Sequence, residues 1–213
     1  MSSLARFLFY NILVRFVVSI VLGVNVRNRH RLPKAGPAIV VANHNSHLDT
    51  MVLTTLFPAR LLHLIKPVAA MDYFLTSPLM SWFALRVIGI VPLKRKRDTP
   101  EENLLQPIYD ALDERRILIF FPEGSRGEAE VMLDIKSGIA RLAAKYPEIP
   151  IVPVVMHGLG KALPKGETLL VPFFCDVYVG EPIQWNGDHD AYMELVKQRF
   201  KELDQEGQPA EWL

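Results

Sequence analysis

The chain of 213 residues contains a single cysteine, Cys175. One cysteine excludes an internal disulfide framework and is typical of a protein in a reducing compartment. Cys175 alternates with apolar residues between positions 171 and 179. We therefore expect a buried, inert thiol in a strand rather than a nucleophile.

Clusters of metal-binding side chains are also scarce. His44, His47 and Asp49 lie close together in the sequence and carry donor atoms that zinc accepts. No second group of His, Cys or paired acids with ligand spacing follows them. We expect no bound metal, and a metal-dependent hydrolase is a weaker alternative.

Acidic residues are missing from residues 1–48, and Asp49 is the first carboxylate. Six Lys or Arg side chains fall in that stretch, although the whole chain carries a net charge of only +1. A basic N-terminal part on a slightly acidic body indicates an anionic surface as partner. We expect a membrane surface with anionic lipids, and no nucleic acid.

The apolar segment 4–24 is long enough to span a membrane, but Arg15 interrupts it. Asn11, Arg15 and Ser19 are four residues apart and would form one polar stripe on a helix. We therefore expect residues 1–30 to be a membrane-associating helix with a basic segment, at the cytoplasmic face. A helix that lies in the interface is favoured, and a spanning helix and a helix packed on the domain are the alternatives.

Apolar runs that end in polar or glycine-containing turns alternate with amphipathic stretches over the rest of the chain. The expected strands are 38–42, one within 60–70, 87–93, 117–121, 149–156 and 169–179. The expected helices are 77–87, 99–116, 137–146 and 190–203. The helix from Thr99 has the cap, proline and glutamate of a helix start. Such alternation predicts an α/β fold, a single-domain layered sheet with flanking helices, over residues 31–213.

His44 closely follows the apolar run 38–42, so we expect it at the exit of a buried strand. Ser46 and Asp49 resemble a capping box at the start of the next helix. On one ideal helix His44 and Asp49 would point about 140° apart, so they can meet only if His44 stays in the loop. The Asp49 carboxylate would then fix the tautomer of the ring and stabilise its protonated form. The pair predicts a general base with its orienting acid, and a plain helix cap is the alternative.

Two later strand exits carry arginine. Arg95 follows the apolar segment 87–93, and Arg126 follows the turn Pro122-Glu123-Gly124-Ser125. Guanidinium groups and the N–H groups of a glycine turn suit a phosphate, and ligands gather at strand ends in α/β folds. A base beside a phosphate site implies proton removal from a phosphorylated alcohol. Taken singly, each segment also fits an ordinary surface loop.

Four blocks follow one another in a recognisable order. They are Asn43-His44-Asn45-Ser46-His47-Leu48-Asp49, then Gly89-Ile90-Val91-Pro92-Leu93-Lys94-Arg95, then Phe121-Pro122-Glu123-Gly124-Ser125-Arg126, and last Ile151-Val152-Pro153-Val154-Val155. In sequence and spacing these blocks resemble the glycerolipid acyltransferase family, in its lysophosphatidate acyltransferase-like group. The resemblance covers roughly residues 30 to 185, so residues 31–213 are interpreted as an acyltransferase domain.

The resemblance implies an enzyme of phospholipid biosynthesis or remodelling. It would transfer a fatty acyl group from acyl-CoA or acyl-carrier protein to the hydroxyl of a lysophospholipid, with lysophosphatidate as the favoured acceptor. A thioester is already activated, so attack by the alcohol needs no protein nucleophile, and no cofactor is expected. The alternatives are acylation of another lyso-lipid, such as lyso-ornithine lipid, and a non-catalytic membrane lipid-binding protein.

The resemblance also assigns roles to residues. His44 is implied as the catalytic base and Asp49 as the acid that orients it. The residues implied in binding the phosphate of the acceptor are Arg95, Glu123, Gly124, Ser125 and Arg126.

Overall fold

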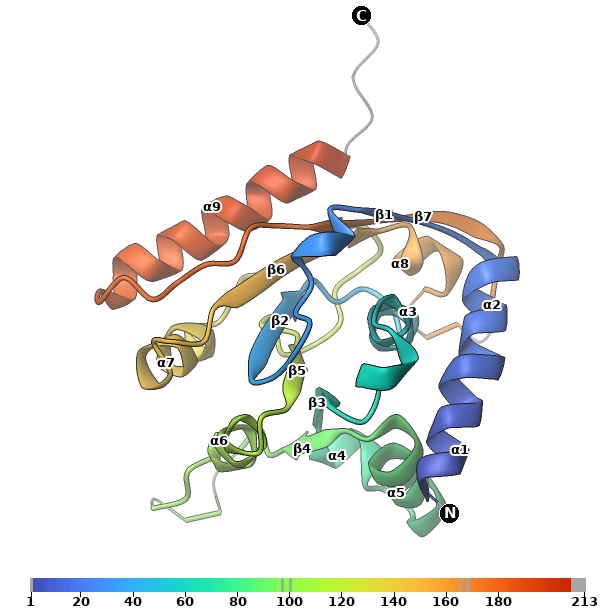
Figure 1. Cartoon of the computed structure of the whole chain (residues 1–213), viewed down its shortest axis with the longest axis horizontal. Coiled ribbons are helices and arrows are strands. Elements are labelled where there is room, and N and C mark those ends of the chain that lie inside the picture. The colour runs from blue at the N-terminus through green and yellow to red at the C-terminus, as the bar shows by residue number, and fades with distance from the viewer. Residues whose placement is uncertain (1, 97, 100, 165, 168, 208–213) are drawn as a thin grey trace, which may run out of the picture. The chain divides into compact units, whose positions relative to one another are not determined.

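The computed structural model describes residues 2–96, 98–99, 101–164, 166–167 and 169–207 (Figure 1). Its strands are β1 Leu22–Arg27, β2 Ala38–Ala42, β3 Ile65–Ala70, β4 Val91–Leu93, β5 Ile117–Phe120, β6 Ile151–His157 and β7 Phe173–Val179. They form a seven-stranded sheet in the order β1-β7-β6-β2-β5-β3-β4. The sheet is mixed, because β1 pairs with β7 in parallel whereas β6 and β7 are antiparallel.

Helices connect most of these strands, which confirms the predicted α/β layered sheet with flanking helices. The α-helices are α1 Ser2–Leu8, α2 Arg15–Ile20, α3 Leu48–Leu56, α4 Met71–Phe74, α5 Pro78–Trp82, α6 Gln106–Asp113, α7 Gly138–Lys145, α8 Leu159–Ala162 and α9 His189–Gly207. The π-helical segments are η1 Phe9–Val14 and η4 Phe83–Ile88, and the 3₁₀ segments are η2 Arg29–Arg31 and η3 Ala59–Leu61.

The chain divides into two compact units. The first unit comprises Met1–Phe16, Pro33–Ile39 and Thr50–Phe120, and the second comprises Val17–Leu32, Val40–Asp49 and Phe121–Leu213. The predicted boundary at residue 30, between an N-terminal segment and an acyltransferase domain, stays a prediction.

The first unit is built on three parallel strands. β3 pairs with β5 through Ile65 and Ile117, and with β4 through Val68 and Val91. Both isoleucines are fully buried, as expected of parallel strands that helices cover.

The N-terminal helix packs on this unit through its polar side chains. Arg6 Nη2 donates to the carbonyl of Ile65 at 2.7 Å, and Arg15 Nη2 donates to the carbonyl of Phe57 at 2.9 Å. Arg15, at the centre of the predicted polar stripe, therefore faces the protein, whereas Ser19 of the same stripe is exposed. Large apolar side chains on the remaining face are exposed, namely Leu4, Phe7, Leu8, Ile12, Leu13 and Phe16.

The predicted helix 4–24 is wrong at its C-terminal end, because helical structure stops at Ile20 and residues 22–27 form β1. Residues 22–27 are drawn into the sheet by pairing in register with β7, from Leu22 opposite Phe173 to Arg27 opposite Tyr178. Within the described ranges, every helix is too short or too polar to cross a bilayer. Association of this helix with a membrane stays a prediction.

The helix predicted to start at Thr99 begins instead at Gln106. Glu102, expected to close a capping box, accepts from the Lys94 ammonium at 2.6 Å and from the backbone N–H of Asp98 at 2.7 Å. These contacts close a loop, and a proline in the first turn of α6 then starts the helix. Pro100 lies outside the described residues.

The second unit is closed by α9. Five of its side chains are buried, and they are Tyr192, Met193, Val196, Phe200 and Leu203. Cys175 on β7 is also fully buried. The burial in a strand predicted from the sequence is thus confirmed. Burial also raises the pKa of the thiol to about 12, and its inertness stays a prediction.

Candidate functional site

The site starts where β2 ends. The five residues of β2 are buried, and the next side chain, Asn43, bonds to β6 as a strand backbone would. Its Oδ1 accepts from the N–H of Met156 at 2.8 Å, and its Nδ2 donates to the carbonyl of the same residue at 2.9 Å. The backbone after Asn43 is thereby free to leave the sheet, and His44 lies in the loop as predicted.

His44 and Asp49 meet in this loop. His44 Nδ1 lies 2.8 Å from Asp49 Oδ2, and the same oxygen accepts from the N–H groups of Asn45 at 2.7 Å and Ser46 at 2.9 Å. The contact with Ser46 is one half of the predicted capping box at the start of α3. An ionised Asp49 keeps the proton of a neutral His44 on Nδ1, so Nε2 is the atom that can accept a proton.

The surroundings hold the imidazole in one orientation. The ring stacks on Phe121, with centroids 4.1 Å apart and planes inclined by 19°. Asp49 is 1% exposed, whereas the His44 side chain is 20% exposed. The acid is therefore shielded from water while the ring stays accessible, as a general base with a buried orienting acid requires.

Glu123 ties the third block to this loop. Its carboxylate accepts from the N–H of His44 at 2.7 Å and from the N–H of Leu133 at 2.8 Å. Burial raises the pKa of Glu123, and these two N–H groups oppose that rise. Both contacts position backbone, so the geometry favours a positioning role for Glu123, and its contact with a phosphate stays a prediction.

The turn after Glu123 lies beside the His44 loop. The N–H of Gly127 donates to the carbonyl of His44 at 2.8 Å. Gly124 and Ser125 are exposed and Arg126 is half-buried. The pKa of His47 is lowered by burial and, to a smaller extent, by the positive charge of Arg126. The Arg126 guanidinium is therefore near the His44 loop.

Gly124 has a structural reason to be glycine. Its φ is +74°, and a Cβ atom there would lie 2.6 Å from Lys136 Nζ. A side chain would therefore be strained and would displace the ammonium group. Lys136 adds a cation to the turn.

Arg95 belongs to the first unit, just after β4. It is exposed and donates to Asp72 Oδ2 at 3.2 Å. Its participation in the His44 site stays a prediction. The other six predicted residues lie in the second unit, on the loop after β2, the first turn of α3 and the loop after β5.

Asn45 is a site residue that the sequence reasoning left without a role. Its buried Nδ2 donates to the carbonyl oxygens of Glu128 and Val131, at 2.5 and 2.9 Å. It therefore holds the far end of the loop that carries Arg126. Its place between His44 and Ser46 is the sequence signal, but its partners are more than 80 residues away. Across the described ranges, no group of three His, Cys, Asp or Glu side chains is arranged to hold a metal ion.

Comparison with known proteins adds independent findings. The family model described as Acyltransferase matches residues 23–157. The chain is 31% identical over 144 residues to the chloroplastic 1-acyl-sn-glycerol-3-phosphate acyltransferase LPAT1 of Arabidopsis thaliana. This alignment covers 67% of this chain and 38% of that protein. The chain is 29% identical over 165 residues to human 1-acyl-sn-glycerol-3-phosphate acyltransferase alpha, covering 77% and 56%. The chain thus spans between about two fifths and just over half of these relatives.

A solved structure shares the fold. The 1-acyl-sn-glycerophosphate acyltransferase PlsC from Thermotoga maritima superposes with a TM-score of 0.71, over 93% of this chain and 78% of that chain. The sequences are 22% identical, so this likeness supports the architecture and says nothing of the substrate.

Proposed function

The chain belongs to the Acyltransferase family, and on that basis we propose that it transfers a fatty acyl group from an acyl thioester to the hydroxyl of lysophosphatidate. The observation that carries the proposal is the His44 ring held at 2.8 Å by a buried Asp49. The acceptor is supported by the names of the relatives above, which are 1-acyl-sn-glycerol-3-phosphate acyltransferases.

In this proposal His44 works as base and then as acid. Nε2 takes the proton of the acceptor hydroxyl as its oxygen attacks the thioester carbonyl. The tetrahedral intermediate collapses, the C–S bond breaks, and the leaving thiolate takes the proton back from His44. Asp49 stabilises the imidazolium between the two steps and fixes Nδ1 as the protonated atom.

The acceptor phosphate is proposed to bind at the turn after β5. Arg126 supplies a guanidinium, and Gly124 and Ser125 present an exposed turn with backbone N–H and hydroxyl donors. Arg95 is proposed as a second phosphate ligand. Holding the phosphate would place the hydroxyl near His44, so binding contributes to alignment as well as to affinity.

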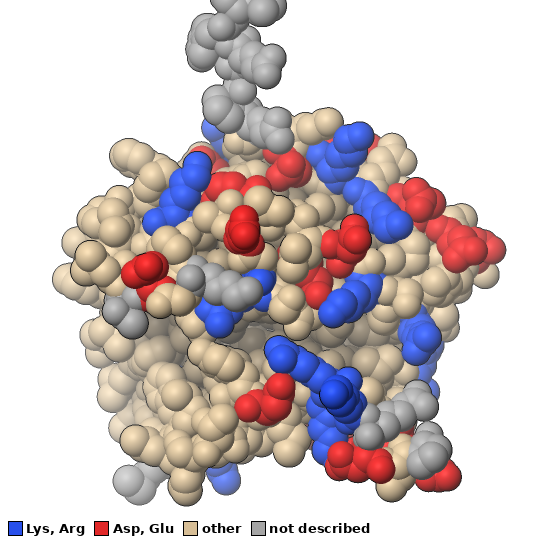
Figure 2. Space-filling view, turned by 180° about the vertical axis from the view of Figure 1, so that it is seen from behind, with Lys and Arg blue, Asp and Glu red and all other residues tan. Residues whose placement is uncertain are grey.

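The acyl donor is proposed to be acyl-CoA or acyl-carrier protein, with no cofactor. We also propose that the protein acts at the cytoplasmic face of a membrane with anionic lipids. The exposed apolar face of α1 and η1 supports this location, because such a face is favoured in lipid and costly in water. In Figure 2 charged side chains are sparse at the lower left, around α5 of the same unit.

The acceptor site is tested with purified protein, labelled acyl-CoA or acyl-carrier protein, and two acceptors that differ by the phosphate, lysophosphatidate and monoacylglycerol. Arg126→Ala should raise the KM for lysophosphatidate by about tenfold or more, since a charged hydrogen bond contributes roughly 1.5–3 kcal/mol. Turnover of monoacylglycerol should not change. Arg141→Ala, at an exposed position on α7, is the matched control. Equal loss with both acceptors would remove Arg126 from phosphate binding, and no acyl transfer to lysophosphatidate by the unmodified protein would overturn the proposed function.

A further inference from the structure

A second basic site lies in the first unit. A cavity of about 350 Å³ opens between η3, β3, η4 and α1. Four of its lining residues carry cationic or titratable groups, and they are Arg6, His63, Lys66 and Arg86. Among the residues that the structure describes, no Asp or Glu lines it. The Glu114 carboxylate acts to raise the pKa of Lys66 from outside this lining, so the wall of the cavity itself carries cationic groups and no carboxylate.

Arg6 is the most buried of these groups. It is 9% exposed, and its Nη2 is held by the carbonyl of Ile65 at 2.7 Å. Its Nε is buried and has no hydrogen-bond partner within the described part of the chain. A buried N–H group without an acceptor is costly, so an anion in the cavity would supply what Arg6 lacks.

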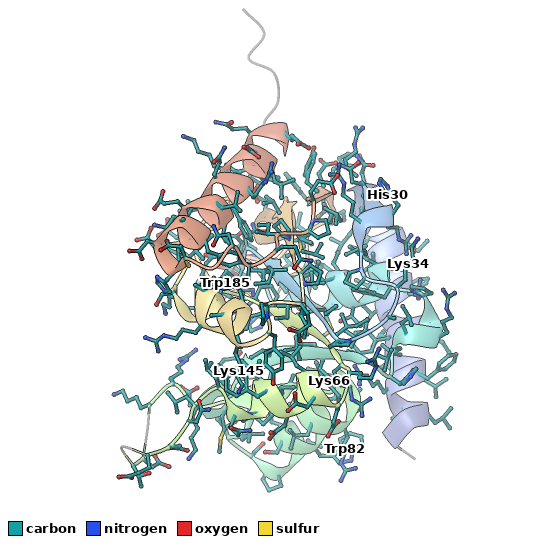
Figure 3. All side chains as sticks on the ribbon, turned by 60° about the vertical axis from the view of Figure 1, so that its left-hand side comes forward. His30, Lys34, Lys66, Trp82, Lys145 and Trp185 are labelled. Atoms are coloured by element: carbon teal, nitrogen blue, oxygen red, sulfur yellow. The ribbon has the colours of Figure 1, made fainter. Side chains whose placement is uncertain are left out.

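Lys66, labelled in Figure 3, lines the same cavity from β3. Burial, followed by the charges of Arg6 and Arg116, lowers the pKa of Lys66. Neither Lys66 nor Arg86 has an ion-pair partner among the residues that the structure describes. Repulsion between these cations is relieved when a phosphate enters, because its oxygens accept from ammonium and guanidinium groups together.

The rim of the cavity is apolar and exposed. Phe7 and Leu85 line it and are 48% and 39% exposed. Phe7 belongs to the exposed apolar face of α1 and η1. Leu85 lies on η4, which directly follows α5 in the chain, and α5 exposes Leu79, Met80 and Trp82 (Trp82 is labelled in Figure 3). The rings of Phe9 on η1 and Phe83 on η4 contact each other edge-on, with their centroids 5.3 Å apart.

From this arrangement we propose that the cavity binds the phosphate of an anionic phospholipid headgroup, with the acyl chains running along Phe7 and Leu85. A basic pocket beside an apolar surface matches a molecule with an anionic end and an apolar end. A free phosphate or the phosphates of CoA share the headgroup chemistry but have no use for the apolar rim. The proposal extends the membrane association proposed above, and its test does not depend on acyl transfer.

The test uses the full chain and a double variant that removes two positive charges from the pocket, Lys66→Gln with Arg86→Gln. The control, Lys34→Gln with Lys201→Gln, removes the same charge from exposed positions. Dihexanoyl phosphatidylglycerol, inorganic phosphate and CoA are titrated below micelle concentrations, and Kd is measured by calorimetry. The Kd of the short-chain lipid should be the same for the unmodified protein and the control. For the pocket variant the Kd should be higher by about tenfold or more, as expected when two charged contacts are lost.

Vesicles of phosphatidylcholine with and without phosphatidylglycerol form the second arm. Phosphatidylglycerol should increase vesicle binding by the unmodified protein. The pocket variant should lose at least about fivefold more of this increase than the control does, and its binding to pure phosphatidylcholine vesicles should not change. Equal losses by both double variants would mean diffuse attraction and overturn the site. Tighter binding of inorganic phosphate or CoA than of the short-chain lipid would overturn the lipid as ligand. If the unmodified protein binds no vesicles, membrane association fails, and the short-chain titration still decides the pocket.

Discussion

The Oδ2 atom of Asp49 receives three groups at once, the His44 ring and the N–H groups of Asn45 and Ser46. One carboxylate oxygen therefore shapes the loop, caps α3 and orients the base. Such sharing couples the local fold to the chemistry, since the Asp49 side chain cannot move without moving the imidazole. Besides this contact with Asp49, the His44 ring stacks on the face of Phe121. Neither contact of the ring holds a backbone N–H group, unlike the contacts of Asp49.

At the residue scale, His44→Ala should lower kcat for acyl transfer by about 10²–10⁴-fold, the usual contribution of a positioned general base. The free energy of unfolding should fall by no more than about 1 kcal/mol, because a surface-accessible ring is lost rather than a core side chain. Acyl transfer kinetics and urea denaturation measure the two effects. His189→Ala, at an exposed histidine of α9, should change neither. A His44→Ala protein with unchanged kcat would exclude His44 from the reaction.

At the element scale, the N-terminal helix buries polar side chains and exposes apolar ones, the opposite of a helix on a water-soluble surface. Arg6, Tyr10 and Arg15 bond to backbone carbonyls of the first unit. The large exposed side chains of the helix are apolar, among them Leu4, Phe7, Leu8, Ile12, Leu13 and Phe16. Tyr10 is buried, and burial raises the pKa of its hydroxyl to about 12. Deleting residues 1–30 would remove the buried contacts of this helix and strand β1. Substitutions on the exposed face therefore test membrane binding more directly.

We expect Ile12→Asp with Leu13→Asp to weaken binding to phospholipid vesicles by tenfold or more, since each change places a charge in the apolar face. Both side chains are more than half exposed, at 61% and 55%, so the free energy of unfolding should stay within about 0.5 kcal/mol of the original. Vesicle sedimentation gives the binding. The matched control is Leu169→Asp with Val171→Asp, an exposed apolar pair of the second unit. Equal effects of the two pairs would contradict a membrane-binding role for the helix.

At the scale of the whole molecule, His157 connects three parts of the second unit. Its Nδ1 lies 3.3 Å from Glu130 of the site loop and its Nε2 lies 3.5 Å from Asp204 of α9. The hydrogen bond with Glu130 raises the pKa of His157, burial opposes the rise, and the charges of Asp204 and Asp176 add to it. The protonated ring is thus stabilised in the folded protein.

A folded-state pKa above the unfolded value gives stability that is fully present below the unfolded pKa of about 6.5. That stability is lost as the pH rises through the folded pKa. The difference in unfolding free energy between the unmodified protein and His157→Gln should therefore be largest near pH 5.5 and shrink at pH 8.5. Urea denaturation at the two pH values measures it. A difference that grows with pH would show that His157 is stabilised in its neutral form, and His189→Gln, with an exposed ring, serves as control.

The sequence by itself determined the alternation of strands and helices and the pairing of His44 with Asp49. Both depend on neighbours in the chain, because apolar periodicity and a capping box act over a few residues. It also determined the buried Cys175, since alternation along a strand decides which side chains face the core.

Only the tertiary structure decided what distant segments do. Residues 22–27 are a strand because β7 offers a partner, and α6 starts late because Lys94 and Asp98 occupy Glu102. The duties of Glu123 and Asn45 and the orientation of the N-terminal helix likewise rest on contacts between residues far apart in sequence. Local sequence preferences are worth a few tenths of a kcal/mol per residue, and the burial and hydrogen bonds of the folded chain outweigh them.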